Sequence, residues 1–403
     1  MTALLIFAIA LFLALLVSDL ADRSVLSTAV LFLGAGFLVG PGMLNFLPLT
    51  HDDAIVKHLA ELALFSVLFT DGMRAGIRDL VNAWHLPGRA LLLGMPLTLL
   101  ATAGLAYYLA GISWIEALLI GAILSPTDPV FAAAIIGRKE IPGRLKHLLN
   151  VESGVNDGLA LPFVLICLSV IGHYEAGYAG LAIELLLGIA IGVIVPWIAC
   201  WLRSSRYFGV AKPFEPLFAV AIGLLVLAIA SMAHGNIYLA AYFAGVTIAS
   251  TRPSLRDEFH RFGELITELL KLGTLLVFGA LISPKFFGHL HALDYLFAAL
   301  ALLLARPAAM LISLWRSELD WRERLTAAWF GPKGFASVVY GLLLFQREVP
   351  NAERLFHLIA LVIAGSIIAH SSTDVPLARW FHCDHEPGED PQGDRAANET
   401  ITE

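Results

Sequence analysis

The chain has 403 residues, a formal net charge of −7, 58% hydrophobic residues and 15% charged residues. Soluble globular domains have about 25% charged residues, so this composition excludes an ordinary soluble domain and predicts a polytopic membrane protein in the lipid bilayer. Many acidic residues lie near the C-terminus, and the net charge therefore gives no reason to expect a nucleic-acid partner.

Apolar runs of about 17–25 residues, each long enough to cross a hydrocarbon core of about 30 Å, recur along the whole chain. They predict an all-α membrane protein with thirteen transmembrane helices. Two of these runs predict a helix less strongly than the others. The run at residues 236–250 is short, and the run at residues 263–283 contains Glu264, Glu268 and Lys271. The predicted helices span residues 3–18, 24–40, 55–73, 88–111, 114–136, 147–172, 176–202, 214–234, 236–250, 263–283, 291–315, 323–346 and 354–372.

In this arrangement, basic residues divide unequally between the two sides of the membrane. The loops after even-numbered helices contain only Lys285, Arg347 and Arg354, whereas the loops after odd-numbered helices contain most of the other lysines and arginines. Because cytoplasmic loops are enriched in basic residues, we expect a multi-pass protein of the cell (inner or plasma) membrane, with its N-terminus outside and its C-terminus in the cytoplasm. Residues 373–403 are polar and acidic, and are predicted to form a disordered cytoplasmic tail.

The fifth predicted helix is interrupted by Ser125, Pro126, Thr127, Asp128 and Pro129. Each proline removes a helical hydrogen bond and clashes with the preceding turn. Non-helical backbone at this depth is tolerated only where protein buries it or a cavity hydrates it. The segment therefore predicts a helix break near the middle of the membrane, beside a hydroxyl group and a carboxylate.

The sixth predicted helix contains a cluster of polar side chains, Glu152, Ser153, Asn156 and Asp157. A charge at the bilayer centre costs roughly 2.5–3.5 kcal/mol even on permissive insertion scales. Spacings of three and four residues place all four side chains on one helical face. At a rise of 1.5 Å per residue, Asp157 lies roughly 15 Å from the cytoplasmic end, near the midplane. This face predicts an ion or proton pathway.

Two further charges in predicted helices have depths that suggest partners. Arg306, in the eleventh helix, and Glu152 both lie about 8 Å from the cytoplasmic side. Each would be costly alone, so we predict that they form an ion pair, and that removing one partner costs a few kcal/mol. Asp71 lies on the third helix, closer to the cytoplasmic side.

The twelfth predicted helix is interrupted by Gly331, Pro332, Lys333 and Gly334. Helices 5 and 12 enter the membrane from opposite sides, and two interrupted helices in corresponding positions of two halves are typical of inverted-repeat transporters. We therefore predict two crossed broken helices. The negative charge of Asp128 is placed to compensate the dipole at the N-terminus of a half-helix. The positive charge of Lys333 is placed to compensate the dipole at the C-terminus of a half-helix.

With these motifs in this order, residues 1–372 resemble the NhaP/NHE-type monovalent cation:proton antiporters, such as bacterial or archaeal sodium/proton antiporters. The resemblance implies a homodimer in which a core bundle, residues 88–172 and 291–372, moves against a dimerisation or scaffold part, residues 1–73 and 176–283. It also implies a role in pH homeostasis and sodium transport. The chain is accordingly expected to be a transporter rather than an enzyme, with no cofactor besides the transported Na⁺ and H⁺.

The resemblance further implies roles for individual residues. Asp157 is expected to bind both the cation and the proton. The remaining Na⁺ ligands are expected to be Ser153, Asp71 and the backbone of Thr127. The residues expected to support the site are Asn156 and Asp128 at the broken helices, the Glu152–Arg306 ion pair, and Lys333, at a position where many relatives have Arg.

The chemistry expected of Asp157 is competition between two ligands. Sodium is a hard cation that prefers oxygen ligands. Burial favours the protonated form of a carboxylate, whereas a nearby cation favours the ionised form, so one carboxylate can hold either a proton or a cation. Because position 156 is Asn and not a second acid, we expect electroneutral one-for-one exchange. A second titrating carboxylate at Asp71 would change this stoichiometry.

Three alternative functions can be compared with sodium/proton exchange on the basis of the sequence. A K⁺/H⁺ antiporter of the same fold would use the same types of ligand. A sodium-coupled solute symporter would need a polar cluster for an organic substrate, and none is evident. An intramembrane protease would need Tyr-Asp and Gly-x-Gly-Asp or His-Glu-x-x-His signatures, which the chain lacks.

Overall fold

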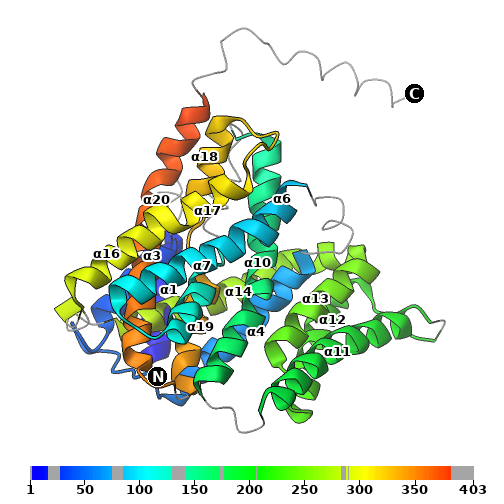
Figure 1. The fold of residues 1–403 in the computed structure, drawn as a ribbon. Coiled ribbons are helices and arrows are strands. Elements are labelled where there is room, and N and C mark those ends of the chain that lie inside the picture. The colour runs from blue at the N-terminus through cyan, green and yellow to red at the C-terminus, as the bar shows by residue number, and fades with distance from the viewer. Residues whose placement is uncertain are drawn as a thin grey trace.

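The computed structural model of the protein is helical throughout the part of the chain that it describes (Figure 1). This agrees with the all-α class that the apolar runs predicted. The described residues are 2–16, 28–74, 85–128, 141–172, 177–205, 207–282, 287, 288, 290–347 and 349–382.

Three π-helical turns continue neighbouring α-helices: η1 (Ala90–Gly94) and η2 (Ala106–Ala110) flank α7, and η4 (Ala301–Ala305) joins α16 to α17. A short 3-10 turn, η3 (Lys212–Phe214), precedes α12. The α-helices are α1 (Thr2–Leu16), α3 (Thr28–Val39), α4 (Ala54–Arg74), α6 (Leu86–Arg89), α7 (Met95–Leu105), α8 (Trp114–Leu124), α10 (Gly143–Ile171), α11 (Gly177–Arg203), α12 (Glu215–Met232), α13 (Ile237–Thr251), α14 (Pro253–Leu281), α16 (Ala292–Leu300), α17 (Arg306–Ser313), α18 (Trp321–Trp329), α19 (Phe335–Gln346) and α20 (Ala352–His382).

Six of the described helical stretches are long and apolar enough to cross a membrane. Each overlaps one of the predicted spans, and shorter apolar helices occupy several of the others. The protein is therefore a multi-pass, all-α membrane protein. The six stretches are Leu86–Ala110, Gly143–Ile171, Gly177–Arg203, Lys212–Met232, Ala292–Ser313 and Ala352–Thr373.

Two helices extend about ten residues beyond the boundary predicted from the sequence. Helix α14 begins at Pro253 rather than near residue 263, because proline is well tolerated at the first helical position, where its missing N–H has no helical acceptor. Helix α20 continues to His382, so the boundary predicted at residue 373 for a disordered tail is wrong. Trp380 packs against Trp321, with ring centroids 5.3 Å apart, and this contact holds the last turns of α20 against α18. Residues 383–403 lie outside the described residues.

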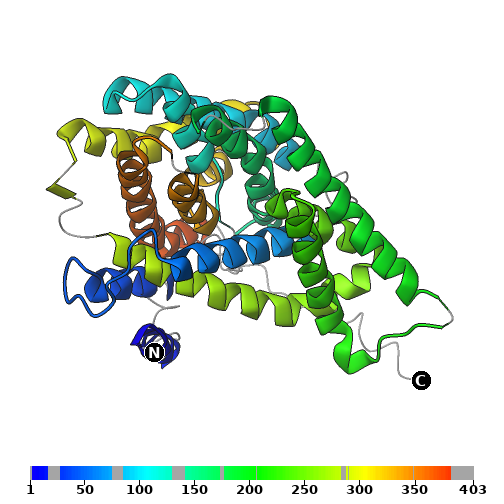
Figure 2. The same cartoon turned by 90° about the horizontal axis from the view of Figure 1, so that it is seen from below.

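The helices form two groups on either side of α10. Helices α11, α12 and α13 lie on one side of the molecule, and α16, α17, α18 and α20 lie on the opposite side (Figures 1 and 2). In the first group, α4 packs against α13 and α14. In the second, α8 packs against α7, and α17 packs against α18. Helix α10 contacts both α8 and α4, so its polar face lies between the groups.

Candidate functional site

Two non-helical segments meet inside the protein. Helix α8 ends at Leu124 and is followed by the non-helical residues 125–128, while residues 330–334 are non-helical between α18 and α19. The Asp128 N–H donates to the Pro332 carbonyl oxygen at 3.0 Å, which joins the two segments through their backbones. Pro129, the second proline of the predicted break, lies outside the described residues. The helix interruption predicted within residues 323–346 is thus present.

The helix ends at these segments have side-chain partners. The Asp128 carboxylate accepts a hydrogen bond from the N–H of Phe335, the first residue of α19, at 2.9 Å. A carboxylate at this position satisfies a free N–H group and compensates the positive end of the helix dipole. At the end of α8, the Ser337 hydroxyl donates to the Ile123 carbonyl oxygen at 2.7 Å. The end of α8 and the start of α19 are therefore each stabilised by a side chain from the other part of the chain.

Lys333 is buried, and its backbone rather than its ammonium group makes the polar contact. Its N–H donates to the Ser366 hydroxyl at 2.8 Å. Its Nζ atom is buried and has no hydrogen-bond partner among the residues that the structure describes. The side-chain amine of Lys333 thus lies at the break without a fixed hydrogen bond, whereas an arginine there would present a planar fork of five N–H donors to be satisfied.

Three polar side chains form a small cluster between α10 and the non-helical segment after α8. The Asn156 amide donates to the Thr127 hydroxyl at 2.7 Å, and the Thr127 and Ser153 hydroxyls lie 3.2 Å apart. The Asn156 side-chain oxygen is buried and lacks a hydrogen-bond partner within the described ranges. The cluster brings predicted ligand and support residues together, although here Thr127 makes these contacts through its hydroxyl and not its backbone.

Asp157 and Asp71 approach each other from α10 and α4. Both are buried, with 3% and 1% of their surface exposed, and their carboxyl groups act on each other electrostatically. Arg74 lies near them, with Nη1 3.8 Å from Asp71 Oδ1. Two neighbouring buried carboxylates cannot both remain ionised without a counter-charge. The pair can therefore share a proton or bind a hard cation.

Glu152 and Arg306 form the ion pair that their matching depths predicted. Arg306 Nη1 lies 2.8 Å from Glu152 Oε1, and both side chains are almost completely buried. Arg306 Nη2 is also 3.5 Å from the Phe330 carbonyl oxygen, which links the pair to the non-helical segment before α19. The second Glu152 oxygen and the Arg306 Nε atom have no hydrogen-bond partner among the described residues.

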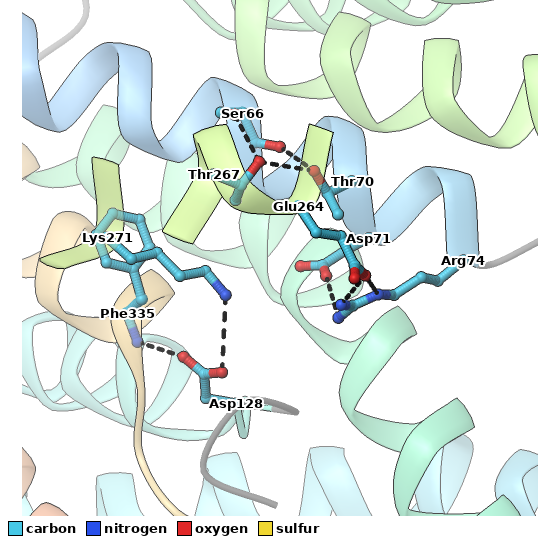
Figure 3. A network of polar contacts seen from close by, with 9 residues as sticks. All are labelled: Ser66, Thr70, Asp71, Arg74, Asp128, Glu264, Thr267, Lys271 and Phe335. Carbon is cyan, nitrogen blue, oxygen red and sulfur yellow. Dashed lines mark hydrogen bonds and ion pairs between the residues drawn. The ribbon is translucent and has the colours of Figure 1, made fainter. Parts of the chain in front are cut away.

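Helix α14 contributes a set of polar residues that the sequence analysis did not assign to the site (Figure 3). Lys271 Nζ lies 3.9 Å from Asp128 Oδ1, and Glu264 forms an ion pair with Arg74 of α4. The Thr267 hydroxyl contacts two hydroxyl groups of α4. A signal was present in the sequence, because positions 264, 267, 268 and 271 share one helical face. In a hydropathy pattern the same charges weaken the predicted span at residues 263–283.

A methyl group added at Gly334 is expected to disrupt the contact between the two non-helical segments. The added Cβ would lie 1.9 Å from the Asp128 Cβ. Overpacking of this kind costs about 1–3 kcal/mol, so Gly334→Ala should lower the unfolding temperature of the purified protein in detergent. Gly104→Ala is the matched control, because its added Cβ has no heavy atom within 4 Å. Equal unfolding temperatures for the two variants would contradict the close approach.

The comparisons with known proteins give one consistent result. The family described as "Sodium/hydrogen exchanger, transmembrane" matches residues 7–380. The K⁺/H⁺ antiporter NhaP of Alkalimonas amylolytica is 27% identical over 386 residues, which cover 92% of this chain and 66% of the relative. The K⁺/H⁺ antiporter NhaP2 of Shewanella sp. (strain MR-4) is 25% identical, with 91% of this chain and 64% of the relative covered. The chain thus spans about two thirds of the length of these curated relatives.

The fold also resembles a solved structure. The sodium proton antiporter MjNhaP1 from Methanocaldococcus jannaschii, determined at pH 8, superposes with a TM-score of 0.77 at 20% identity. The similarity covers 94% of this chain and 98% of that one, and at this identity it shows a shared fold. Because the family match extends over nearly all the described residues, the chain belongs to the transmembrane sodium/hydrogen exchanger family.

Proposed function

We propose that the protein is a secondary active antiporter that exchanges a monovalent cation for H⁺, with Na⁺ as its main cation and Li⁺ also accepted. The observation that supports this most directly is the pair of neighbouring buried carboxylates, Asp157 and Asp71. These carboxylates lie in the same buried region as the hydroxyls of Thr127 and Ser153, at the meeting of two non-helical segments. Carboxylate and hydroxyl oxygens are the ligand types that hard cations prefer.

Competition for Asp157 would couple the two ions. When the carboxylate is protonated, it cannot neutralise a cation, and when it binds a cation, the proton must leave. Asp71 and Ser153 would complete the cation's oxygen shell, together with Thr127. Alternation of this site between the two sides of the membrane would then move one ion in each direction.

The exchange is proposed to be electroneutral. Asn156, beside Asp157, is neutral and bonds to Thr127, so one proton exchanged for one cation moves no net charge at Asp157. The second buried carboxylate, Asp71 near Asp157, is the feature that would change this stoichiometry. If Asp71 also released a proton in each cycle, the transport rate would depend on the membrane potential.

Potassium is the second candidate for the transported cation. The relatives from Alkalimonas amylolytica and Shewanella sp. (strain MR-4) are named as K⁺/H⁺ antiporters. The oxygen ligands at Asp157 and Asp71 suit K⁺ as well as Na⁺ in chemical type. The types of ligand do not separate Na⁺ from K⁺, so a transport measurement with each cation is needed to distinguish them.

We also propose how the membrane part is arranged. The predicted scaffold contains α4, α11, α13 and α14, which pack against one another, and the predicted core contains α7, α8, α17 and α20. The joined non-helical segments at Asp128 and Pro332 support two crossed broken helices within a thirteen-helix inverted repeat. The scaffold is proposed to form a homodimer in the cell's inner or plasma membrane, with the N-terminus outside.

The test is ion-driven proton movement in proteoliposomes that contain the full chain. A pH gradient, acidic inside, would be imposed, and Na⁺, Li⁺, K⁺ or the bulky cation N-methylglucamine would be added while a pH dye is followed. We expect Na⁺ and Li⁺ to collapse the gradient at the same rate under clamped potentials of either sign. Collapse by K⁺ alone would select the second candidate. No response to any of the three inorganic cations would contradict antiport, with protein-free vesicles as the background.

A further inference from the structure

Lys271 is a buried cation that approaches the candidate site from α14. Only 6% of its surface is exposed, and its Nζ atom lies 3.9 Å from Asp128 Oδ1 (Figure 3). The charged groups that act on it electrostatically are Asp128, Asp71, Glu268 and Arg74. Removing an ammonium group from water is costly unless opposite charges compensate it, and the nearby carboxylates supply that compensation.

The two partners of this ion pair are fastened to different groups of helices. Lys271 belongs to α14, which is held to α4 by hydrogen bonds from Thr267 to the Ser66 and Thr70 hydroxyls, at 2.8 and 3.0 Å. The Glu264–Arg74 ion pair joins the same two helices. Helix α4 in turn packs against α13. Lys271 is therefore held within the group of helices that we assign to the scaffold.

Asp128 is held within the other group. Its N–H donates to the Pro332 carbonyl oxygen at 3.0 Å, and its Oδ2 atom accepts from the Phe335 N–H at 2.9 Å. Both partners belong to the α18–α19 segment, which lies in the proposed core. The Lys271–Asp128 contact thus crosses from scaffold to core. Any movement of the core against the scaffold must stretch or break it.

We propose that this ion pair is a latch that prevents the antiporter from reorienting while its site holds neither cation nor proton. The inference rests on the proposed function. In the empty site, the negative charges of Asp157 and Asp71 add to that of Asp128 and hold the Lys271 ammonium in place. A bound cation or proton cancels one of these charges and weakens the attraction. The loaded core is then free to move, whereas the empty core stays latched.

The latch would determine how tightly the two ion flows are coupled. If an empty carrier could reorient, cations would move down their gradient without a proton in exchange, and each would transfer one positive charge across the membrane. With the latch in place, the carrier returns only when a proton or another cation is bound. Lys271 is in this sense a positioning residue for exchange, and not a ligand of the transported ion.

The test measures the ratio of protons to cations moved in proteoliposomes, with a pH dye and a radioactive tracer of the cation that the wild type exchanges. For Lys271→Gln we expect a net tracer flux without a pH gradient that is about tenfold faster than in the wild type, which corresponds to ~1.4 kcal/mol. The proton-to-cation ratio should fall, and the flux should depend on membrane potential. Lys271→Arg, which keeps the charge, should remain coupled.

Two further variants make the test decisive. The double variant Lys271→Gln, Asp128→Asn removes both charges and leaves no unpaired charge at this contact. It should show the same uncoupled cation flux even if the single variant fails to fold. Lys57→Gln, at a surface lysine 3.3 Å from Asp52, should retain the wild-type ratio. Coupled exchange by the wild type with an unchanged ratio in the single and double variants would overturn the latch alone, as would a leak in Lys271→Arg. Absence of exchange by the wild type would overturn the proposed function instead.

Discussion

Asp157→Asn is expected to reduce cation-dependent proton movement to the level of protein-free vesicles. The amide is nearly the same size as the carboxylate but neither releases a proton nor neutralises a cation. The substitution removes one of the two neighbouring buried carboxylates of α10 and α4. The measurement is the pH-dye response in proteoliposomes to Na⁺, Li⁺ and K⁺ over a range of pH values.

The matched control for this variant is Asp52→Asn, the same chemical change at a side chain that is 72% exposed. It should exchange ions at the wild-type rate. Asp157→Asn should also unfold at a temperature close to that of the wild type or above it, since it removes a buried like charge. Exchange well above background in folded Asp157→Asn protein would show that Asp71 alone suffices, and would refute the role proposed for Asp157.

Glu152→Gln is expected to destabilise the protein by about 3–5 kcal/mol, because breaking a buried ion pair leaves the other charge without compensation. The glutamine amide oxygen can still accept a hydrogen bond from Arg306, as can the Phe330 carbonyl oxygen at 3.5 Å, but neither carries the negative charge that Glu152 supplies. The loss would appear as a lower unfolding temperature in detergent. It should accompany reduced transport, because Arg306 lies against the non-helical segment before α19.

Removing both charges of the Glu152–Arg306 pair should destabilise the protein much less than removing one of them. A Glu152→Gln, Arg306→Met double variant leaves no buried charge at either position, and replacing a buried pair by neutral groups is often close to neutral in stability. The unpartnered Glu152 Oε2 and Arg306 Nε atoms favour this outcome, since the pair is incompletely hydrogen-bonded within the described residues. A double variant that is as unstable as the sum of the two single variants would show that the charges do not act as a pair.

A surface ion pair provides a comparison for the buried Glu152–Arg306 pair. Lys57 and Asp52 lie 3.3 Å apart at exposed positions, where such pairs contribute only about 0–1 kcal/mol. Lys57→Gln should therefore leave the unfolding temperature almost unchanged. The contrast between the two pairs separates the effect of burial from that of charge alone.

Much of this protein follows from its sequence because the membrane restricts what each residue type can do. Long apolar runs can satisfy their backbone groups in lipid only as helices, which determines the all-α class. Pro332 cannot continue a helix, and the chain is indeed non-helical from residue 330 to 334. Helical periodicity alone places Ser153, Asn156 and Asp157 on one face of α10, and depth along the helices is enough to match Glu152 with Arg306.

Helix ends were less predictable where a helix is amphipathic or held by tertiary contacts. Pro253 marks a helix start that the polar composition of the following residues concealed. The last turns of α20 contain Asp374, Pro376 and Arg379 among apolar residues, and they are helical where Trp380 packs against Trp321. In both cases the helix extends beyond the continuous apolar run by which a hydropathy pattern recognises a span.

The contacts at the centre of the site depended on tertiary structure. Asp71 and Asp157 meet because α4 packs against α10, and Thr127 uses its side chain because the end of α8 lies beside Ser153. Lys271 reaches Asp128 across 143 positions of the chain, and neither residue's local pattern specifies the other. Periodicity determines which face of a helix is polar, but only the packing of separate helices determines which polar faces meet.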